Sequence, residues 1–417
     1  MKSKFLILFL MITAVSLKAG EIDILLDRLV EKNVLSGAEA QEIRYETEEE
    51  VKKEISRSQH RTLPIWLQNI TFGGDLRLRY QNENNFNLSY NRQRFRLRTR
   101  LYINAKVNEN LFAYTQIATG EKTDPRSTNQ TLTDNFAKKN IYLDYSYMEW
   151  NLNEILSITA GKIKTPFYSA SDMLWDTDIN EEGGVIKMEY PVFTNSRFNS
   201  NAGMFMLKEN SSSKDQTMFY ASEVFTYRND ENTFNLKTAF SYYGFLNLKG
   251  NPELTDRPST NHIKSNTVIG SKYLYGYKTA TMDLEISKNF ERPLSFYINE
   301  VRNITLFSTL AKNTAISEDK RNKAWLFGIR VGHEKVSNTG EFNLSYSRRW
   351  LEDNAFLDTY PDSDFFGGST GVKGDELILC YGLGRDFNIT FDYYNAKPIK
   401  NIKKGEELLQ IDLNMKF

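Results

Sequence analysis

The sequence has little that could form a disulfide framework or a histidine-based catalytic centre. Among its 417 residues there are one cysteine, Cys380, and three histidines. A single cysteine excludes both an intramolecular disulfide and a cluster of thiolate ligands. The histidines His60, His262 and His333 lie far apart in the sequence and in no metal-binding spacing. We therefore expect no catalytic or metal-binding residues and no cofactor, and the protein is not predicted to be an enzyme.

The chain also lacks a net charge and a long apolar run. Its 53 basic residues equal its 53 acidic residues, which argues against a nucleic-acid partner. The mean hydropathy is -0.53, and after residue 19 no stretch approaches the roughly twenty apolar residues of a membrane-spanning helix. Transmembrane β-strands escape this test, because each lipid-facing residue alternates with a polar residue that faces the lumen.

Residues 1–19 have the pattern of a secretory signal peptide. Lys2 and Lys4 precede an apolar stretch at 5–15, and residues 16–19 form a short segment that predicts cleavage after Ala19. The mature protein is therefore expected outside the cytoplasm.

Residues 20–58 predict a periplasmic helical hairpin or coiled-coil segment. Apolar residues between 22 and 30 follow helical spacing, and Ser36 with Glu39 has the spacing of a capping box. An equally weighted alternative is a mobile polar extension, since the segment has few apolar positions. Residues 59–69 would then form a linker to the remainder of the chain.

From residue 70 to residue 417 the dominant pattern is an alternation of apolar and polar residues. The last strand shows it most clearly, since its odd-numbered residues from Leu409 to Phe417 are all apolar and the residues between them are polar. Alternation that ends on an aromatic residue is typical of the closing strand of an outer-membrane barrel. The 23 Tyr, 27 Phe and 5 Trp fit the aromatic girdles of such a barrel. The predicted fold is an all-β, transmembrane antiparallel β-barrel.

The alternation predicts about eighteen strands, or about sixteen if one hairpin in the weakest stretch, 267–312, is spurious. The predicted strands are 70–80, 94–107, 111–119, 140–150, 156–164, 184–191, 201–208, 216–227, 233–243, 267–277, 281–288, 294–300, 303–312, 323–334, 340–350, 376–385, 387–396 and 407–417. Long polar connections mostly follow the odd-numbered strands and tight turns the even-numbered ones, so loops lie at one end and turns at the other. A barrel of either size encloses an aqueous channel.

One predicted strand, 94–107, carries a row of arginines on a single face. The residues between them are apolar or Thr, and the preceding strand repeats the arrangement with two arginines. An arginine at the bilayer midplane of a barrel costs about 2 to 4 kcal/mol, so the row must face the lumen. The predicted pore-lining residues are Arg77, Arg79, Arg94, Arg96, Arg98, Arg100, Lys106, Lys162 and Lys164.

Two interpretations of this row carry equal weight. Side chains two apart on a strand lie about 7 Å from each other, so the arginines repel unless something negative screens them. The row either attracts anions into the pore, or it pairs with carboxylates and leaves the conductance nearly unselective.

The loop from Thr165 to Gly184 could supply the negative charge. If it folds inward, it narrows the lumen opposite the arginines and sets a transverse field across it. The alternative is an acidic loop exposed outside the cell, because loops lie on the surface by default. The predicted constriction residues are Asp172, Asp176, Asp178, Glu181 and Glu182.

Several short motifs resemble those of a known family. They are the leader, the helical segment at 25–35, the run FGGDLRLR at 72–79, the run GKIKTPF at 161–167 and the terminal Phe417. Over nearly the whole mature chain the sequence is similar to Gram-negative putative porins and, more loosely, to phosphate-selective porins. The resemblance implies passive diffusion through a barrel that is commonly trimeric, and the arginine row is similar to the ladders of anion-selective relatives.

The sequence therefore predicts a passive diffusion channel, embedded as a multi-pass barrel in a Gram-negative outer membrane. The expected partners are outer-membrane lipid, small hydrophilic or anionic solutes, and further copies of the chain in a homotrimer. The main alternative is a structural or adhesive barrel with little conductance.

Overall fold

The computed structural model describes residues 32, 43, 68–86, 90–133, 136–211, 214–254, 265–296, 299–317, 321–400 and 404–417. The chain divides into two compact units, Met1–Asn69 and Ile70–Phe417. The predictions for 1–19, 20–58 and 59–69 lie outside the described residues, apart from residues 32, 43, 68 and 69. Within the described part, no helix is long and apolar enough to cross a bilayer.

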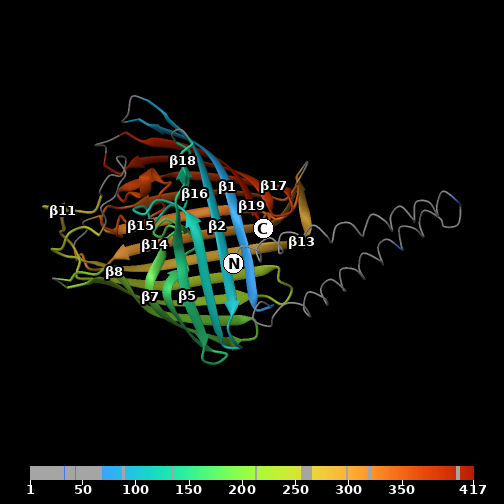
Figure 1. Ribbon diagram of the computed structural model, residues 1–417, viewed down its shortest axis with the longest axis horizontal. Coiled ribbons are helices and arrows are strands. Elements are labelled where there is room, and N and C mark those ends of the chain that lie inside the picture. Colours follow the sequence, from blue (N-terminus) through green and yellow to red (C-terminus); the bar gives the residue numbers. More distant parts are fainter. Residues whose placement is uncertain are drawn as a thin grey trace, which may run out of the picture. The chain divides into compact units, whose positions relative to one another are not determined.

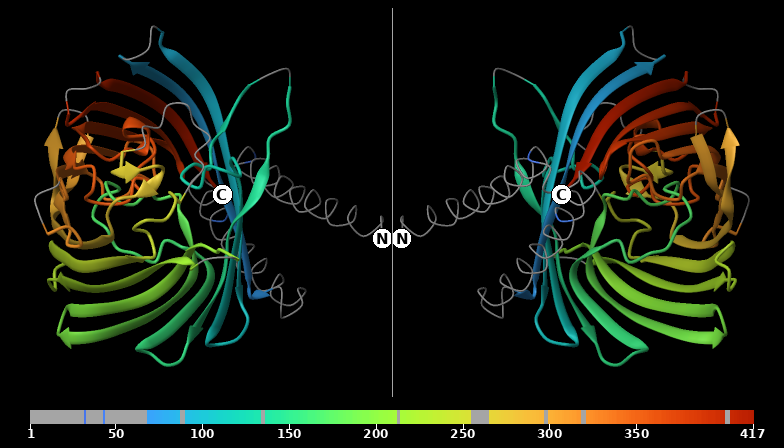
Figure 2. Two further views of the ribbon diagram at one scale, coloured as in Figure 1. Left: turned by 90° about the vertical axis from the view of Figure 1, so that its left-hand side faces the viewer. Right: turned by 90° about the vertical axis from the view of Figure 1, so that its right-hand side faces the viewer.

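The second unit is a closed antiparallel β-barrel of 16 strands (Figures 1 and 2). The barrel strands, in order around the wall, are β1 (Ile70–Asn85), β2 (Arg92–Lys106), β3 (Leu111–Thr119), β5 (Ile141–Asn151), β6 (Leu156–Lys164), β7 (Asn180–Phe193), β8 (Ser196–Lys208), β9 (Gln216–Arg228), β10 (Phe234–Leu246), β13 (Tyr277–Phe296), β14 (Asn299–Asn313), β15 (Lys323–Gly332), β16 (Phe342–Leu351), β17 (Val372–Gly384), β18 (Phe387–Pro398) and β19 (Glu406–Lys416). β19 closes the ring by pairing with β1. The all-β barrel predicted from the alternation is confirmed.

A few short elements lie outside the ring. β4 (Gln130–Thr131) pairs with β2, and β11 (Val268–Ile269) pairs with β12 (Lys272–Tyr273) in a separate hairpin. A 3-10 turn, η1, covers Phe366–Gly368.

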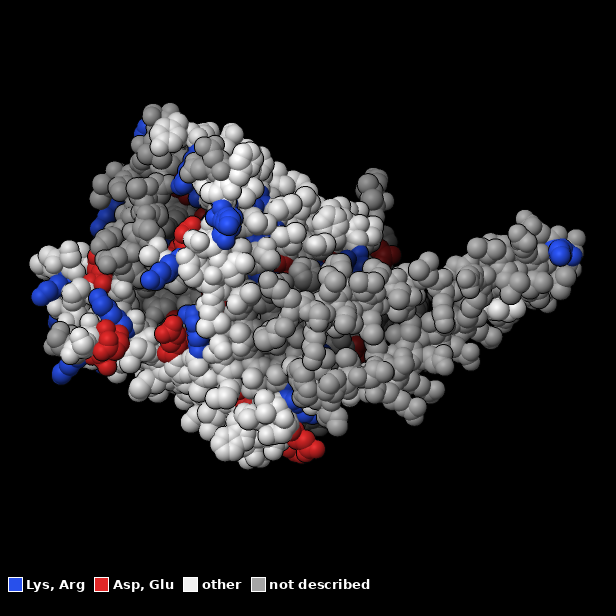
Figure 3. All heavy atoms as spheres, in the orientation of Figure 1, with Lys and Arg blue, Asp and Glu red and all other residues white. Residues whose placement is uncertain are grey.

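The two faces of the closing strand divide as predicted. Leu413 is 38% exposed on the outer face, whereas Gln410 and Asp412 are buried on the inner face. The last residue completes the seam, because the N–H of Phe417 donates to the Gly74 carbonyl at 3.1 Å and the Gly74 N–H donates back at 2.9 Å. In Figure 3 the charged side chains gather toward the left, where β11 lies in Figure 1, and the described strand surface beside them is mostly uncharged.

The count is sixteen because the stretch 267–312 contains one hairpin fewer than the larger prediction. The predicted strand 267–277 is wrong, since only the small β11–β12 hairpin forms before β13 begins at Tyr277. The predicted strands 281–288 and 294–300 are not separate, because β13 runs as far as Phe296 with a register shift between Asn289 and Leu294. Such a bulge interrupts the alternation of side chains without ending the strand, and the sequence pattern therefore resembled a turn.

The connections alternate between the two ends of the barrel, and those at one end are mostly longer. At the turn end the connections are 107–110, 152–155, 194–195, 229–233, 297–298, 333–341 and 385–386. At the loop end they are 86–91, 120–140, 165–179, 209–215, 247–276, 314–322, 352–371 and 399–405. In outer-membrane barrels the longer loops are extracellular and the short turns are periplasmic, which orients this barrel.

The outer face leads to a direct energetic prediction. Leu306 lies in the middle of β14 and is 54% exposed, so Leu306→Arg should lower the free energy of unfolding in lipid vesicles by about 2 to 4 kcal/mol. Asn199→Arg places the same side chain beside a luminal cavity and serves as the control, with little expected change. Denaturant titration of both variants measures the difference, and equal losses would contradict the assignment of the two faces.

Candidate functional site in the barrel lumen

Two connections from the loop end fold into the barrel, where Figure 2 shows loop segments inside the ring of strands. We call residues 165–179, between β6 and β7, inner loop A, and residues 352–371, between β16 and β17, inner loop B.

Inner loop A crosses the lumen to the far wall. The N–H of Ala170 donates to Asp283 Oδ1 on β13 at 2.9 Å, and the hydroxyl groups of Ser171 and Thr309, on β14, lie 2.8 Å apart. The alternative of an acidic loop exposed outside the cell is therefore wrong.

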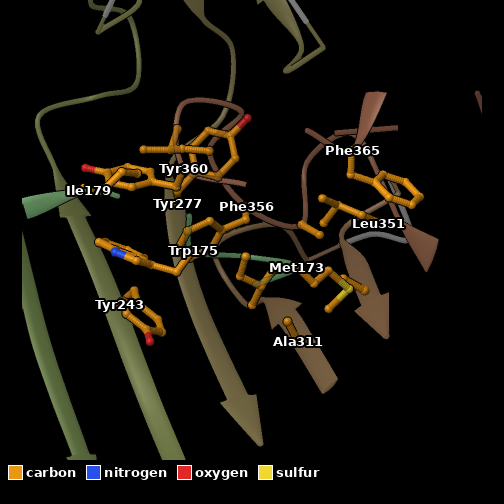
Figure 4. Packing of buried hydrophobic residues seen from close by; sticks show 14 of the residues in the cluster. Met173, Trp175, Ile179, Tyr243, Tyr277, Ala311, Leu351, Phe356, Tyr360 and Phe365 are labelled. Atoms are coloured by element: carbon orange, nitrogen blue, oxygen red, sulfur yellow. The ribbon is translucent and has the colours of Figure 1, made fainter. Parts of the chain in front are cut away.

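The two inner loops pack against each other through an aromatic cluster (Figure 4). Trp175 of inner loop A stacks on Tyr360 of inner loop B with ring centroids 4.4 Å apart. Phe356 meets Trp175 edge-on at 5.9 Å and Tyr243 of β10 at 5.4 Å, and all four rings are buried. Aromatic pairs of this kind contribute about 0.5 to 1.5 kcal/mol each beyond the area that they bury. The cluster therefore holds both loops inside the lumen.

The apolar cluster extends over most of the inner wall but not all of it. Every barrel strand from β6 to β19 contributes to it, with the members Ile163, Val185, Phe205, Tyr220, Tyr243, Tyr277, Phe307, Leu326, Leu351, Val372, Tyr394 and Leu408. Among the described residues, none of its members comes from β1, β2, β3 or β5. We call these four strands the polar wall, because they carry the arginine row and line a polar cavity, although Phe112, Tyr114 and Tyr147 also lie on their inner face.

Polar contacts from two further loops fix inner loop B. Arg126, in the 120–140 loop, is buried and donates from Nη1 to the carbonyl oxygens of Pro361 and Gly368, both at 3.0 Å. The Asn266 side chain donates to the carbonyl oxygens of Asp353 at 2.7 Å and Phe356 at 2.9 Å. Buried carbonyl groups need such donors. These hydrogen bonds and the aromatic cluster connect inner loops A and B with the loops 120–140 and 247–276.

On the polar wall, the arginine row is largely paired with carboxylates. Arg79 donates to both carboxylate oxygens of Asp412, on β19, at 2.7 and 2.8 Å, and it contacts Asp364 of inner loop B at 2.9 Å. Arg77 lies 3.4 Å from the same Asp412. Bidentate pairs of this geometry are the strong form of a charge-assisted hydrogen bond.

The arginines of β2 follow the same rule. Asp75 accepts hydrogen bonds from Arg98 at 2.8 Å and from Arg100 at 2.7 Å, and Arg94 lies 3.1 Å from Glu83. The register explains the contact with Arg100, since Asp75 on β1 stands directly opposite Arg100. The acid-paired interpretation therefore describes these arginines.

Arg96 is different from the other arginines of the row. Its guanidinium donates to Gln81 at 3.2 Å, to the Ser127 hydroxyl at 3.1 Å and to the Asn129 carbonyl at 3.4 Å, which are all neutral groups. Over the part of the chain that the structure describes, no carboxylate forms an ion pair with Arg96, so its charge is the least compensated of the row.

A second ionic cluster joins both inner loops to the wall. Arg349 of β16 forms ion pairs with Asp172 of inner loop A at 3.0 Å, with Asp362 of inner loop B at 3.6 Å, and with Glu376 of β17. Burial, together with the neighbouring Asp172, raises the pKa of Asp362 well above its ordinary value although Arg349 opposes the shift. One guanidinium is thus shared by three carboxylates.

Asp364, two residues further on, shows the opposite shift. Burial opposes its ionisation, but the guanidinium groups of Arg79 and Arg96 outweigh that effect and hold the pKa of Asp364 below its ordinary value. Inner loop B therefore presents an ionised carboxylate to the arginine row.

The acids of inner loop A are brought together with the arginine row and inner loop B. Asp176 accepts a hydrogen bond from the N–H of Ser363 at 2.8 Å, and burial, followed by the charge of Asp178, raises the pKa of Asp176. Asp178 itself lies 3.6 Å from Arg100. Through this contact, inner loop A reaches the polar wall.

The predicted bounds of the acidic loop, 165–184, are too long. β7 begins at Asn180 because strand pairing with β6 continues that far, so Glu181 and Glu182 belong to the wall. Glu181 is buried, whereas Glu182 pairs with Lys162 at 3.2 Å. The register partner of Glu182 on β8, Met206, is exposed on the outer face, so the structure does not bring Lys162 and Glu182 into the lumen.

Two solvent-accessible cavities border inner loop A, one near each end of the loop. One, of about 390 Å³, follows the polar wall and is lined by residues that include Asp75, Arg100, Asp144, Lys164 and Asp178. The other, of about 740 Å³, lies toward the turn end and is lined in part by residues 110, 154 and 167. Lys106 ends β2 at the turn end and is exposed.

The sequence analysis did not identify inner loop B. It predicted only a long polar connection, 351–375, between the predicted strands 340–350 and 376–385. The signal that could have found it is the apolar content of its first part. Its buried members are Ala355, Phe356, Leu357, Tyr360, Phe365 and Phe366. A loop exposed to water rarely carries so many large apolar side chains together.

A closed barrel with an apolar outer face and a polar wall inside a narrowed lumen defines the class of outer-membrane diffusion channels. The chain belongs to the putative porin family, whose model matches residues 83–276 and 274–417. It is therefore a porin of the outer membrane, and family and fold point to a channel rather than an enzyme.

Solved structures share the fold. The high-pH structure of Pseudomonas putida OprB covers 84% of this chain and 94% of its own, with a TM-score of 0.53 and 9% identity. Salmonella typhi OmpF in complex with daunomycin covers 85% of this chain and 100% of its own, with a TM-score of 0.47 and 10% identity. At 9% identity the likeness to OprB shows the barrel fold alone. No curated protein matches the sequence.

The carboxylates around Arg349 predict a pH-dependent conductance. Because the pKa of Asp362 is raised in the folded protein, the stabilisation that this group contributes to docking of inner loop B is fully present below its ordinary pKa. It is lost as the pH rises through the raised value. We expect inner loop B to loosen, and the single-channel conductance to increase, from acidic toward alkaline pH.

Asp362→Asn is the matched variant, because it keeps the shape and removes the titration. Its conductance should vary less with pH than that of the wild-type protein when both are recorded in planar bilayers at constant salt. Identical pH profiles would show that Asp362 does not cause the dependence.

Proposed function

We propose that small hydrophilic solutes cross this porin by passive diffusion along the polar wall. The observation that carries the proposal is the uneven filling of the lumen. Beside the inner loops, a buried apolar cluster lies against β6 to β19, whereas the cavity of about 390 Å³ follows β1, β2, β3 and β5. Toward the turn end the cavity of about 740 Å³ opens along β5 to β10. Water and polar solutes gain nothing from an apolar cluster, so the path follows charged and amide side chains.

Inner loop A forms the constriction of this path in our proposal. Asp178 forms an ion pair with Arg100 at 3.6 Å, and the cavity beside this pair is lined by charges of both signs, among them Asp144 and Lys164. A passing solute would meet a transverse field there, which orients dipolar molecules and admits them one at a time.

Pairing of the arginine row supports weak ion selectivity over strong anion selectivity. Carboxylates of β1, β19 and inner loop B offset most of the row. Anion preference stays a prediction, and we propose that whatever preference exists arises at Arg96.

We further propose that the channel is a homotrimer in the outer membrane of a Gram-negative cell. The resemblance of the chain to Gram-negative porins supports both statements. Cross-linking of the detergent-extracted protein would measure the number of copies.

Reconstitution in planar bilayers tests the channel itself. The refolded protein should produce discrete steps of ion-sized conductance. Trp175→Ala removes one ring from the cluster that holds inner loop A, and it should raise the unit conductance because the loops pack less tightly. Absence of steps from both correctly folded proteins would reject the channel and favour a structural barrel.

Arg96→Gln tests the origin of selectivity. It removes the least compensated positive charge of the row, so the reversal potential in a salt gradient should shift toward cation preference. The control is the double variant Glu83→Gln with Arg94→Gln, which removes an ion pair of 3.1 Å without changing the net charge. An equal shift in both would place the selectivity elsewhere.

A further inference from the structure

Four tyrosines lie on the inner face of the polar wall. They are Tyr102 of β2, Tyr114 of β3, and Tyr145 and Tyr147 of β5, and we call them the tyrosine strip. β2 pairs with β3 and β3 with β5, and these strands lie side by side at the front of Figure 1. Strand pairing therefore brings the four rings into one region of the lumen.

The exposure of adjacent residues establishes that the rings point inward. Ile103, next to Tyr102, is 44% exposed on the outer face, and Met148, next to Tyr147, is 59% exposed. Neighbouring residues of a strand point to opposite faces, so both tyrosines point into the lumen. Tyr114 does the same, because it is the register partner of Tyr147.

The tyrosine strip connects the two cavities that border inner loop A. Tyr102 and Tyr145 line the cavity of about 390 Å³, and Glu149, two residues beyond Tyr147, lines the cavity of about 740 Å³. Consecutive inward residues of a strand lie about 7 Å apart, so Tyr114 and Tyr147 occupy the interval between the cavities. A solute that moves from one cavity to the other passes these two rings.

The rings pack against each other without being covered. Tyr114 and Tyr147 stack with ring centroids 4.9 Å apart, and Tyr145 lies 5.7 Å from Tyr147. Tyr114 and Tyr147 are only partly buried. On β6 the register partner of Tyr147 is Gly161, which has no side chain to cover the ring. The strip therefore exposes apolar ring area to the water of the lumen, which is unfavourable until a solute covers it.

Unpaired polar groups lie beside these rings. Across the described residues, the hydroxyl groups of Tyr114 and Tyr147 form no hydrogen bond. Asn104, the register partner of Tyr114, lines the smaller cavity, and its Oδ1 is buried without a hydrogen-bond partner in the same part of the chain. Hydroxyl and amide groups both donate and accept, and buried ones usually find a partner. These groups suit a ligand that has several hydroxyl groups.

The tyrosine strip favours a neutral ligand over an ion. The next inward residues toward the turn end are Lys106, Phe112 and Glu149, which are register partners in that order. They place two charges of opposite sign on either side of an aromatic ring. An ion of either sign gains little from such a balanced surface.

We propose that the tyrosine strip binds neutral saccharides on their way through the channel. This inference rests on the proposed diffusion path along the polar wall. A sugar ring has two faces of C–H groups, which meet the negative face of an aromatic ring favourably. Its hydroxyl groups can pair with the tyrosine hydroxyls and with the Asn104 amide. Two rings in series, those of Tyr145 and Tyr147, offer contacts to more than one sugar unit.

Block of the ion current in planar bilayers tests the proposal. The refolded full-length protein is recorded in potassium chloride while maltotriose, a linear neutral trisaccharide, is added. We expect a saturable decrease of the single-channel conductance. Polyethylene glycol of the same hydrodynamic radius has no sugar ring, and it should reduce the current without saturation.

The variant Tyr114→Leu with Tyr147→Leu removes both rings and should raise the half-blocking concentration of maltotriose about tenfold. Tyr114→Phe with Tyr147→Phe keeps the rings, and its half-blocking concentration should lie between those of the leucine variant and the wild-type protein. The control is Tyr190→Leu with Tyr227→Leu, which removes two tyrosines from the outer face of β7 and β9. Maltotriose should block this control like the wild-type protein.

Conductance steps that maltotriose does not block would overturn this proposal and leave the channel itself intact, whereas absence of steps would reject the channel. Equal block by maltotriose and polyethylene glycol would also overturn the proposal, because it would show exclusion by size alone. Equal weakening by the two leucine variants would do the same, because the outer tyrosines cannot touch a solute in the lumen.

Discussion

Charge compensation inside the barrel is the constraint on which the rest of the structure depends. A row of arginines on two adjacent strands would repel itself in a confined lumen. The carboxylates that offset it come from four places, namely Asp75 and Glu83 on β1, Asp412 on the closing strand, Asp364 on inner loop B and Asp178 on inner loop A. Pairing of β19 with β1 and docking of inner loop B therefore each bring a carboxylate into contact with the arginine row.

The same constraint explains why the lumen is divided into two sides. The arginine row needs acids and water, so β1 and β2 keep polar inner faces. Much of the wall from β6 to β19 is apolar and is covered by inner loops A and B with a packed aromatic cluster, although Arg349 and Asp283 also point inward there. In this porin the packed aromatic cluster narrows the lumen on one side. The pathway that we propose for solutes follows the other, polar side.

The inner and outer faces of this barrel are chemically linked by the alternation of residues along each strand. A residue that points outward has neighbours that point into the lumen, so Trp325 lies between the buried Ala324 and Leu326. At the loop end the outer face changes from apolar residues to tryptophan and then to lysine.

Much of the fold could be predicted from the sequence. The alternation is local, and the cost of an arginine in hydrocarbon depends on that residue alone, so the barrel, its inner and outer faces and the luminal side of the arginine row could all be read from the chain. The larger strand count failed only in the stretch 267–312, where the predicted strand 267–277 does not form and a bulge near Asn289 disturbs the alternation. The acids of inner loop A were also recognised, although the bounds of the loop and the outward position of Lys162 were not.

The partners of these residues were decided by tertiary structure alone. Arg79 meets Asp412, which is 333 positions away, because β1 closes against β19. Arg349 gathers acids from both inner loops because those loops enter the lumen from opposite walls. A sequence pattern reports the direction in which a side chain points. Which distant group it meets depends on ring closure and on the packing of loops within the ring, and these are properties of the whole barrel.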